Sequence, residues 1–299
     1  MLKEYHKSYK STEELIKLLE QRGLSFPDQD RSYEYIKNIG YFRLSAYFYP
    51  LLQSPKSNHI YKLNSTFTNV LDMYRFDKKL RLLAFNEIEK IEVAIRSIMV
   101  NTACEYYGDI FWMTQEKYHH DQNFFFRTLK DIDNELSKSK EDFIIHFRNK
   151  YSDKYPPSWM IAEVLSLGSI CRIFKNLSDI KLKKIIAKEF SLQPAIFESW
   201  IMALVGIRNI CCHHGRLWNR EFAIRILEPK KTPNRWLNDK VDIKRTYFRL
   251  CILKYFLNTI SPNNNFSDKV CTLTKTYTSI DLNALGFQVD WADQPLWNK

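Results

Sequence analysis

The residues best suited to chemistry lie in one short stretch, residues 207–220, which reads IRNICCHHGRLWNR. Four residues separate Arg208 from His213, and Asn209 precedes His213 by four positions, so Asn209 and His213 share one face of a helix. Arginine stays charged and its planar fork matches phosphate, whereas histidine can take and give a proton near pH 7. The pair is sufficient for attack of a ribose 2′-OH on its own phosphate. His213 would act as general base or acid and Arg208 would stabilise phosphoryl charge, without a metal.

The alternative is a capped core helix whose Arg208 and His213 point to solvent or to structural carboxylates. The spacing alone favours this alternative, because an arginine and a histidine occur at such a spacing often by chance. In either case the apolar run Phe197–Ile207 predicts a buried helix that carries the motif at its end. Gly215 is expected to let the chain leave that helix.

Neighbouring residues are predicted to support the motif. Asn209 would orient His213 or a phosphate, and the residues just after the motif would hold the following turn or touch RNA backbone. Glu163 is the single charge in the apolar first half of a helix predicted over Trp159–Leu177, so its carboxylate should have a partner. Arg208 or His213 is a candidate partner, and a cap or loop is at least as suitable. The supporting set is Glu163, His214, Arg216 and Asn219.

The region after the motif is strongly basic, with ten Lys or Arg and four Asp or Glu in residues 216–249. The whole chain carries a formal net charge of +11, which suits a polyanion such as nucleic acid, although solvated lysines alone would give the same value. An aromatic cluster around one arginine at residues 41–49 could stack RNA bases, but such clusters are more often core. The predicted RNA-binding residues are Tyr41, Arg43, Arg220, Arg225, Lys230 and Lys231.

Composition favours an all-α protein. The chain has 299 residues, of which 45% are hydrophobic, with only seven glycines and few alternating runs, so it can bury a helical core. Six cysteines without framework spacing suit a reducing cytosol. Cys211–His214 are four consecutive residues, which cannot surround one tetrahedral ion, so we predict no metal and no cofactor. The first ten residues have no apolar core, and no uninterrupted apolar run approaches the roughly 18 residues that span a bilayer. These features predict a cytoplasmic protein without membrane contact.

Local signals predict the main helices. Ser11 and Glu14 form a capping box, and a 3.6-residue apolar period predicts one long helix, or two nearly collinear ones, over Thr66–Tyr106. Within it Glu92 and Arg96 are spaced as a surface ion pair. His119 and His120 are expected in a solvated turn. The predicted organisation is an N-terminal helical extension at 1–65, a helical domain carrying the motif at 66–260, and a C-terminal helix with a packed tail at 261–299.

The stretch RNICCHHGRLWNR resembles the RN-x-x-x-H…R-x-W/Y-N signature of the Abi (abortive infection) family, in its AbiD/AbiF-like branch. Three other stretches agree with that family in order and spacing, and the resemblance covers roughly residues 10–260. They are IGYFRLSAY (Ile39–Tyr47), YRFDKKLRLLAFNEIEKIEVAIRS (Tyr74–Ser97) and WMIAEVLSLGSICRIFKNL (Trp159–Leu177). The family is in turn similar to the HEPN superfamily, whose ribonucleases carry Arg and His four to six residues apart and act as dimers.

The resemblance implies an all-α helical bundle with a HEPN-like core and an N-terminal helical extension. In this family the Glu92–Arg96 pair could equally face the active-site helix, although we favour the structural surface pair. It further implies an anti-phage or toxin-type effector, a metal-independent endoribonuclease that acts as a homodimer and leaves 2′,3′-cyclic phosphate ends. DNA should be inert because it lacks the attacking 2′-OH. A bound small non-coding RNA is expected to control the protein. Gly215 stands where toxins silenced by nucleotidylation carry a tyrosine, so no nucleotidyltransferase antitoxin is predicted.

Two alternatives remain open at this point. The chain could be a non-catalytic RNA-binding protein in which Arg208 and His213 grip phosphate. It could also be a toxin that blocks a phage protein by direct interaction, with the motif merely structural.

Overall fold

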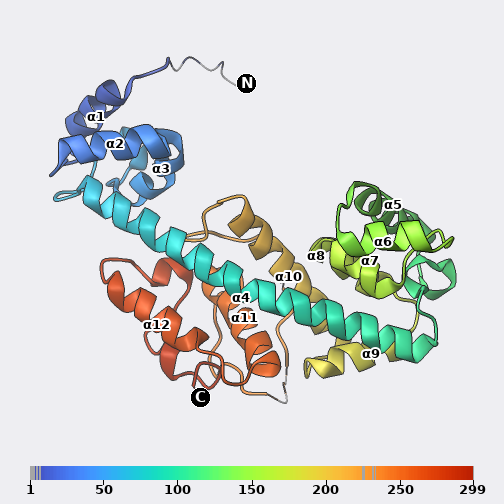
Figure 1. Cartoon of the computed structure of the whole chain (residues 1–299). Coiled ribbons are helices and arrows are strands. Elements are labelled where there is room, and N and C mark those ends of the chain that lie inside the picture. The colour runs from blue at the N-terminus through green and yellow to red at the C-terminus, as the bar shows by residue number, and fades with distance from the viewer. Residues whose placement is uncertain are drawn as a thin grey trace. The chain divides into compact units, whose positions relative to one another are not determined.

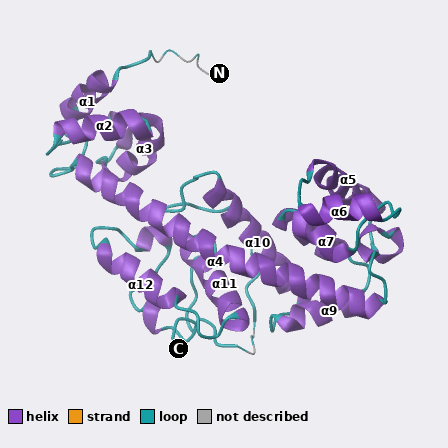
Figure 2. Cartoon of the chain, in the orientation of Figure 1, coloured by secondary structure: helices purple, strands orange, loops and turns teal. Residues whose placement is uncertain are grey.

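The fold is helical throughout the part of the chain that can be described. The computed structural model describes residues 4, 6, 8–223, 226–230, 232 and 234–298. Across these residues it contains twelve α-helices, joined by loops and short 3-10 turns, and no β-strand (Figures 1 and 2). The all-α prediction is therefore confirmed.

The chain divides into two compact units. Unit 1 comprises residues 1–80 and 273–281, and unit 2 comprises residues 81–272 and 282–299. Helix α4 (Phe67–Tyr107) begins in unit 1 and ends in unit 2. The motif at 207–220 lies wholly in unit 2.

Unit 1 begins with three helices, α1 (Thr12–Gln21), α2 (Gln29–Ile39) and α3 (Tyr41–Phe48). The predicted capping box is confirmed at the start of α1: the Ser11 hydroxyl accepts the Glu14 N–H at 3.2 Å, and the Glu14 carboxylate accepts the Ser11 N–H at 2.7 Å. Helix α2 ends at Gly40, whose φ of 89° lies in a region that favours glycine.

Helix α4 is a single helix of 41 residues, so the apolar period over Thr66–Tyr106 describes one element rather than two. In unit 2 its inward face is fully buried at Ile88, Ile91 and Ile95, which recur at helical spacing. Burial along one face, rather than caps, is what stabilises a helix of this length.

Unit 2 continues with α5 (Gln122–Lys138), α6 (Asp142–Lys150), α7 (Ser158–Val164), α8 (Leu167–Asn176) and α9 (Ile180–Glu189). The single helix predicted over Trp159–Leu177 is wrong, because the chain breaks between α7 and α8. Leu165 is extended, and the Ser166 hydroxyl accepts the Ser169 N–H at 3.2 Å and so starts a new helix.

The core of unit 2 forms around α10 (Pro194–Cys212), which contacts α8, α9 and α11 (Thr246–Ile260). Phe197, Trp200 and Leu204 of α10 are completely buried. Among the described helices, α10 alone has the length and apolar composition to cross a membrane. The three neighbouring helices cover one apolar face of α10, which contains these buried residues.

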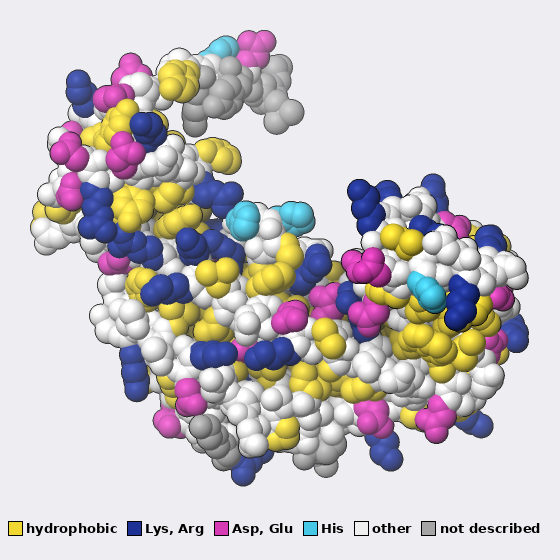
Figure 3. Space-filling model, viewed as in Figure 1, with side chains coloured by type: hydrophobic (Ala, Val, Ile, Leu, Met, Phe, Trp, Pro, Cys, Tyr) yellow, Lys and Arg dark blue, Asp and Glu magenta, His cyan; other side chains and the backbone are white. Residues whose placement is uncertain are grey.

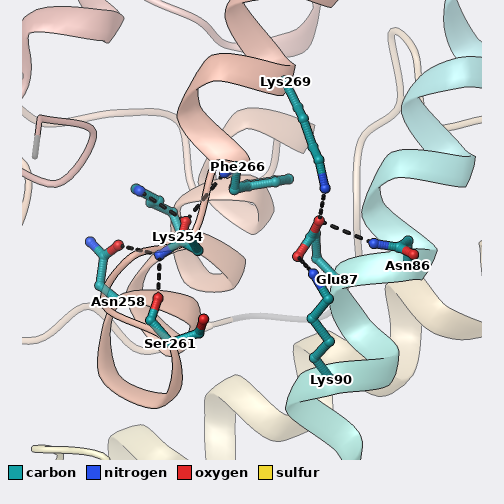
Figure 4. A network of polar contacts seen from close by, with 9 residues as sticks. Asn86, Glu87, Lys90, Lys254, Asn258, Ser261, Phe266 and Lys269 are labelled. Atoms are coloured by element: carbon teal, nitrogen blue, oxygen red, sulfur yellow. Dashed lines mark hydrogen bonds and ion pairs between the residues drawn. The ribbon is translucent and has the colours of Figure 1, made fainter.

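A buried carboxylate joins α4 to α12 (Phe266–Thr276), as Figure 4 shows. The Glu87 side chain is 1% exposed and accepts hydrogen bonds at 2.8 Å from both Lys90 and Lys269. Burial raises the pKa of Glu87, but the two lysines outweigh it and hold this pKa below the ordinary value. The pair of cations therefore keeps a charged carboxylate inside unit 2.

The solvated turn expected at His119 and His120 is wrong for His119. This side chain is buried beside Trp112 and Phe125, with ring centroids 6.5 and 4.9 Å away. Burial lowers the pKa of His119 to about 4. His119 is therefore a neutral packing residue at neutral pH.

Candidate active site at the end of helix α10

The motif sits at the C-terminal end of α10, and the backbone there makes a Schellman turn. His213 is the C-cap, the His214 N–H donates to the Cys211 carbonyl at 3.1 Å, and the Gly215 N–H donates to the Ile210 carbonyl at 2.7 Å. The left-handed residue is His214, with φ of 55°, rather than Gly215. A side chain at 215 would press on Ile210, because an added Cβ would lie 3.2 Å from its Cγ2 and 3.3 Å from its carbonyl oxygen.

The turn leaves the proposed acid–base groups open to solvent. Asn209, His213 and His214 are exposed, and histidine side chains lie at the surface over this end of α10 (Figure 3). Cys211 is buried beneath them. Within the described ranges, no three side chains of His, Cys, Asp or Glu are grouped so that they could hold a metal ion.

Arg208 points to a different neighbour, the middle of α4. Its Nε atom lies 3.9 Å from Oε2 of Glu92, and the two side chains are 35% and 12% exposed. The same Nε is buried and makes no hydrogen bond within the described part of the chain, so the contact with Glu92 is ionic. The guanidinium group of Arg208 is thus held by Glu92 on its Nε side and is partly open to solvent.

Glu92 also accepts a hydrogen bond from Arg96 at 2.5 Å, and Arg96 donates to the Leu165 carbonyl at 2.7 Å. The pair predicted at the surface is therefore mostly buried, and it links α4 to α10 and to the loop between α7 and α8. The break between α7 and α8 exposes the Leu165 carbonyl that Arg96 takes up. One carboxylate between two guanidinium groups fixes where the charge of Arg208 lies.

Glu163, for which Arg208 or His213 is one candidate partner and a cap or loop another, is exposed on α7. The carboxylate paired with Arg208 is that of Glu92. The spacing of Glu92 and Arg96 correctly indicates a pair, and the family resemblance allows that pair to face the helix of the motif, but neither signal names Arg208 as the partner of Glu92.

The basic segment after the motif is partly structural. Arg245 pairs with Glu221 at 3.1 Å and with Asp242 at 3.4 Å, and it donates to Asn219 at 3.4 Å. Arg249 is buried over the Phe222 ring, and burial lowers the pKa of its guanidinium to about 10. Charge counted along residues 216–249 therefore overstates the positive surface beside the motif.

The remaining predicted residues lie at several places. Arg216 is half-buried and its carbonyl accepts from Arg220 at 3.3 Å, and Asn219 has a left-handed φ of 47°. Lys230 is exposed and lines a cavity of about 1100 Å³ together with Lys188. Tyr41 and Arg43 belong to unit 1, where the Tyr41 ring lies 5.7 Å from that of Phe48. Arg225 and Lys231 lie outside the described residues.

The motif and the helices that carry it agree with a known family. A family model described as Abi-like protein matches residues 34–219, which is more than half of the chain. The chain belongs to the Abi-like protein family. The matched region contains α4, the break between α7 and α8, and the Arg208–His213 motif. No curated protein and no solved structure gives a significant match.

Membership of the Abi-like family suggests a role in abortive infection, that is, in defence against phage. The family resemblance seen in the sequence is confirmed at this level.

Proposed function

We propose that this Abi-like protein is an anti-phage effector of the HEPN type, in the AbiD/AbiF-like branch, that cuts RNA without a metal. The observation that carries the proposal is the arrangement at the end of α10. An arginine held by the carboxylate of Glu92 lies within one and a half turns of an exposed histidine and an exposed asparagine. Fixed positive charge beside an exposed proton carrier is what phosphodiester transfer requires.

In the proposed reaction, His213 takes the proton of a ribose 2′-OH. The 2′ oxygen then bonds to the adjacent phosphorus, and the bond from phosphorus to the 5′ oxygen breaks. The 5′ oxygen leaves with a proton from a protonated histidine, so the products are a 2′,3′-cyclic phosphate and a 5′-hydroxyl. Arg208 stabilises the extra negative charge on the phosphoryl oxygens, and Asn209 orients His213 or the phosphate.

We propose that two copies act together, as the resemblance to HEPN ribonucleases implies. Exposed apolar side chains beside the motif support this dimer. Val93, which follows Glu92 on α4, is 56% exposed, and Met202 is 40% exposed on the face of α10 that carries Asn209. These two side chains lie on α4 and α10, the two helices joined by the Arg208–Glu92 ion pair, and we propose them as the apolar contacts of the dimer.

We further propose that a small non-coding RNA holds the effector inactive. The support is the net charge of +11 and the exposed Lys230 downstream of the motif. A bound RNA that occupies the phosphate-binding groups would compete with substrate.

The test compares the wild type with His213→Ala and with His146→Ala, each purified free of RNA. His146 is an exposed histidine on α6, which makes it a matched control. Each protein is incubated with total RNA in EDTA, and the cut ends are analysed. The expected result is cleavage with cyclic phosphate ends by the wild type and the His146 variant, and none by His213→Ala.

The alternatives give different results in the same experiment. If no protein cuts but all bind the added RNA, the chain is a non-catalytic RNA-binding protein. If none cuts and none binds RNA, a toxin that blocks a phage protein by direct interaction becomes the better description.

A further inference from the structure

A second cluster of cations and aromatic rings lies in unit 1, on α2 and the first part of α4. It surrounds a cavity of about 550 Å³, within the ~300–1000 Å³ range of small-molecule sites. We call it the Tyr35 pocket. The lining side chains that matter for the argument are Arg31, Tyr35, Asn38, Tyr74, Arg75 and Lys78.

Two arginines converge on one tyrosine in this pocket. Arg75 donates to the Tyr35 hydroxyl at 2.7 Å, and the guanidinium carbons of Arg75 and Arg31 lie 5.2 and 5.7 Å from the centre of the Tyr35 ring. Hydrogen bonds lower the pKa of the Tyr35 hydroxyl, and the one from Arg75 has a larger effect than the one from Arg31. Because Tyr35 is a neutral side chain, it does not neutralise the two arginines that contact it, and the pocket keeps a net positive charge.

The carboxylates nearby do not cancel this charge. Glu34 lines the pocket, but it lies 3.8 Å from Lys37 and accepts the Asn38 amide at 3.1 Å. Asp72 lies 3.7 Å from Arg75. In the described ranges, Arg31 and Lys78 have no carboxylate partner, and both are exposed. Two cations are therefore available to an anion.

A half-buried aromatic ring completes the pocket. Tyr74 packs edge to face against Tyr47 at 5.6 Å, and the Tyr47 hydroxyl donates to the buried Asp77 at 2.6 Å. This support fixes the Tyr74 ring. A fixed aromatic ring beside free cations can stack a base while the cations bind its phosphate.

We propose that the Tyr35 pocket binds a nucleotide, with Arg31 and Lys78 on the phosphate and Tyr74 against the base. The nucleotide is either part of an RNA strand or a free mononucleotide. The site is separate from Arg208 and His213, and its occupation does not depend on whether those residues cut RNA. Neither Tyr41 nor Arg43 lines it.

The test measures binding to the whole chain with two probes, a fluorescent 2′-O-methyl RNA decamer and 5′-AMP. The methyl group blocks attack by the 2′ oxygen, so the binding result is independent of cleavage. Arg31→Ala/Lys78→Ala is compared with Lys17→Ala/Lys62→Ala, which removes two exposed cations of unit 1 outside the pocket. Thermal unfolding of both double variants checks that they fold.

We expect Arg31→Ala/Lys78→Ala to weaken decamer binding at least about ten-fold and to reduce the slope of log affinity against log salt by about 1.4. Tyr74→Leu should weaken it about ten-fold with little change of that slope. The control double variant should bind as the wild type does. If 5′-AMP binds and competes with the decamer, the pocket takes a free nucleotide; if only the decamer binds, it takes RNA.

Equal binding of both probes by the two double variants would overturn the proposal. So would an affinity loss in Tyr74→Leu no larger than in the control. If the Tyr35 pocket binds nothing but the chain cuts RNA, only the pocket proposal fails. If the pocket binds the decamer but the chain never cuts RNA, only the ribonuclease proposal fails.

Discussion

Arg208 on α10 and Glu92 on α4 form an ion pair of 3.9 Å in which the carboxylate is mostly buried and the guanidinium is partly open. The same carboxylate is held by Arg96, so Glu92 cannot turn away without breaking a second contact. This relationship gives Arg208 a defined position at the base of the exposed motif. It makes Glu92 a positioning residue for the proposed reaction.

Glu92→Gln should slow RNA cleavage by between about 10-fold and 100-fold, because Arg208 and Arg96 lose the charge that orients them. The change should appear in kcat more than in KM. The matched control is Glu89→Gln, an exposed position less than one turn earlier on α4. Equal cleavage rates for the two variants, with equal melting temperatures, would remove Glu92 from the site.

The proposed dimer should dissociate when the exposed apolar side chain next to Glu92, that of Val93, is replaced by a charged one. We expect Val93→Glu to sediment as a monomer and to lose cleavage, because a carboxylate buried in an interface without a partner is costly. Val289→Glu changes a fully exposed valine of the C-terminal segment and serves as control. A Val93→Glu protein that remains dimeric and active would show that this face is not the interface.

His214→Gly should raise the free energy of unfolding by up to about 1 kcal/mol, because glycine adopts the left-handed φ of 55° without steric cost. His214→Val should lower it by about 1–2 kcal/mol. Chemical denaturation measures both. Cleavage by the glycine variant should nevertheless slow, since a strained residue beside the motif is expected to act in it. A stabilised and fully active glycine variant would exclude such a role.

His119 should make the protein sensitive to acid. Its folded-state pKa of about 4 lies below the ordinary histidine value of 6.5, so the unfolded chain binds the proton more readily. The stability that follows is present above pH 6.5 and is lost as the pH falls toward 4, by about 3 kcal/mol. His119→Phe should reduce this loss, as measured by urea denaturation at pH 7 and pH 4. An unchanged pH dependence would mean that His119 takes up no proton on unfolding.

Local signals in the sequence were enough for much of the fold. The capping box at Ser11 and the apolar period of α4 are both local signals, and the helices they predict are present. The break after Val164 is hidden in the sequence because Val164, Leu165, Leu167 and Ile170 fit one helical apolar period on both sides of it. The Ser166 cap starts α8, and Arg96, 69 positions before Leu165, donates to the Leu165 carbonyl at the break.

The candidate site was predictable only in part, for the same reason. The motif residues were found because they are close in sequence. Glu92 was recognised as a partner of Arg96 but not of Arg208, since contacts between distant helices leave no periodic signal. The burial of His119 also depends on residues outside its own turn, Trp112 and Phe125.

Unit 1 is discontinuous, and this bears on how the protein is made. Tyr277 packs against Phe76 at 5.9 Å and lies 5.2 Å from the ammonium group of Lys79, so unit 1 includes residues that the ribosome adds only after nearly all of unit 2. Domains generally fold as they emerge during translation, but unit 1 can be completed only after residues 273–281 have been synthesised. A nascent or prematurely terminated chain therefore carries the α10 motif while unit 1 is still incomplete. Only a chain synthesised beyond residue 281 contains both the motif and the whole of unit 1.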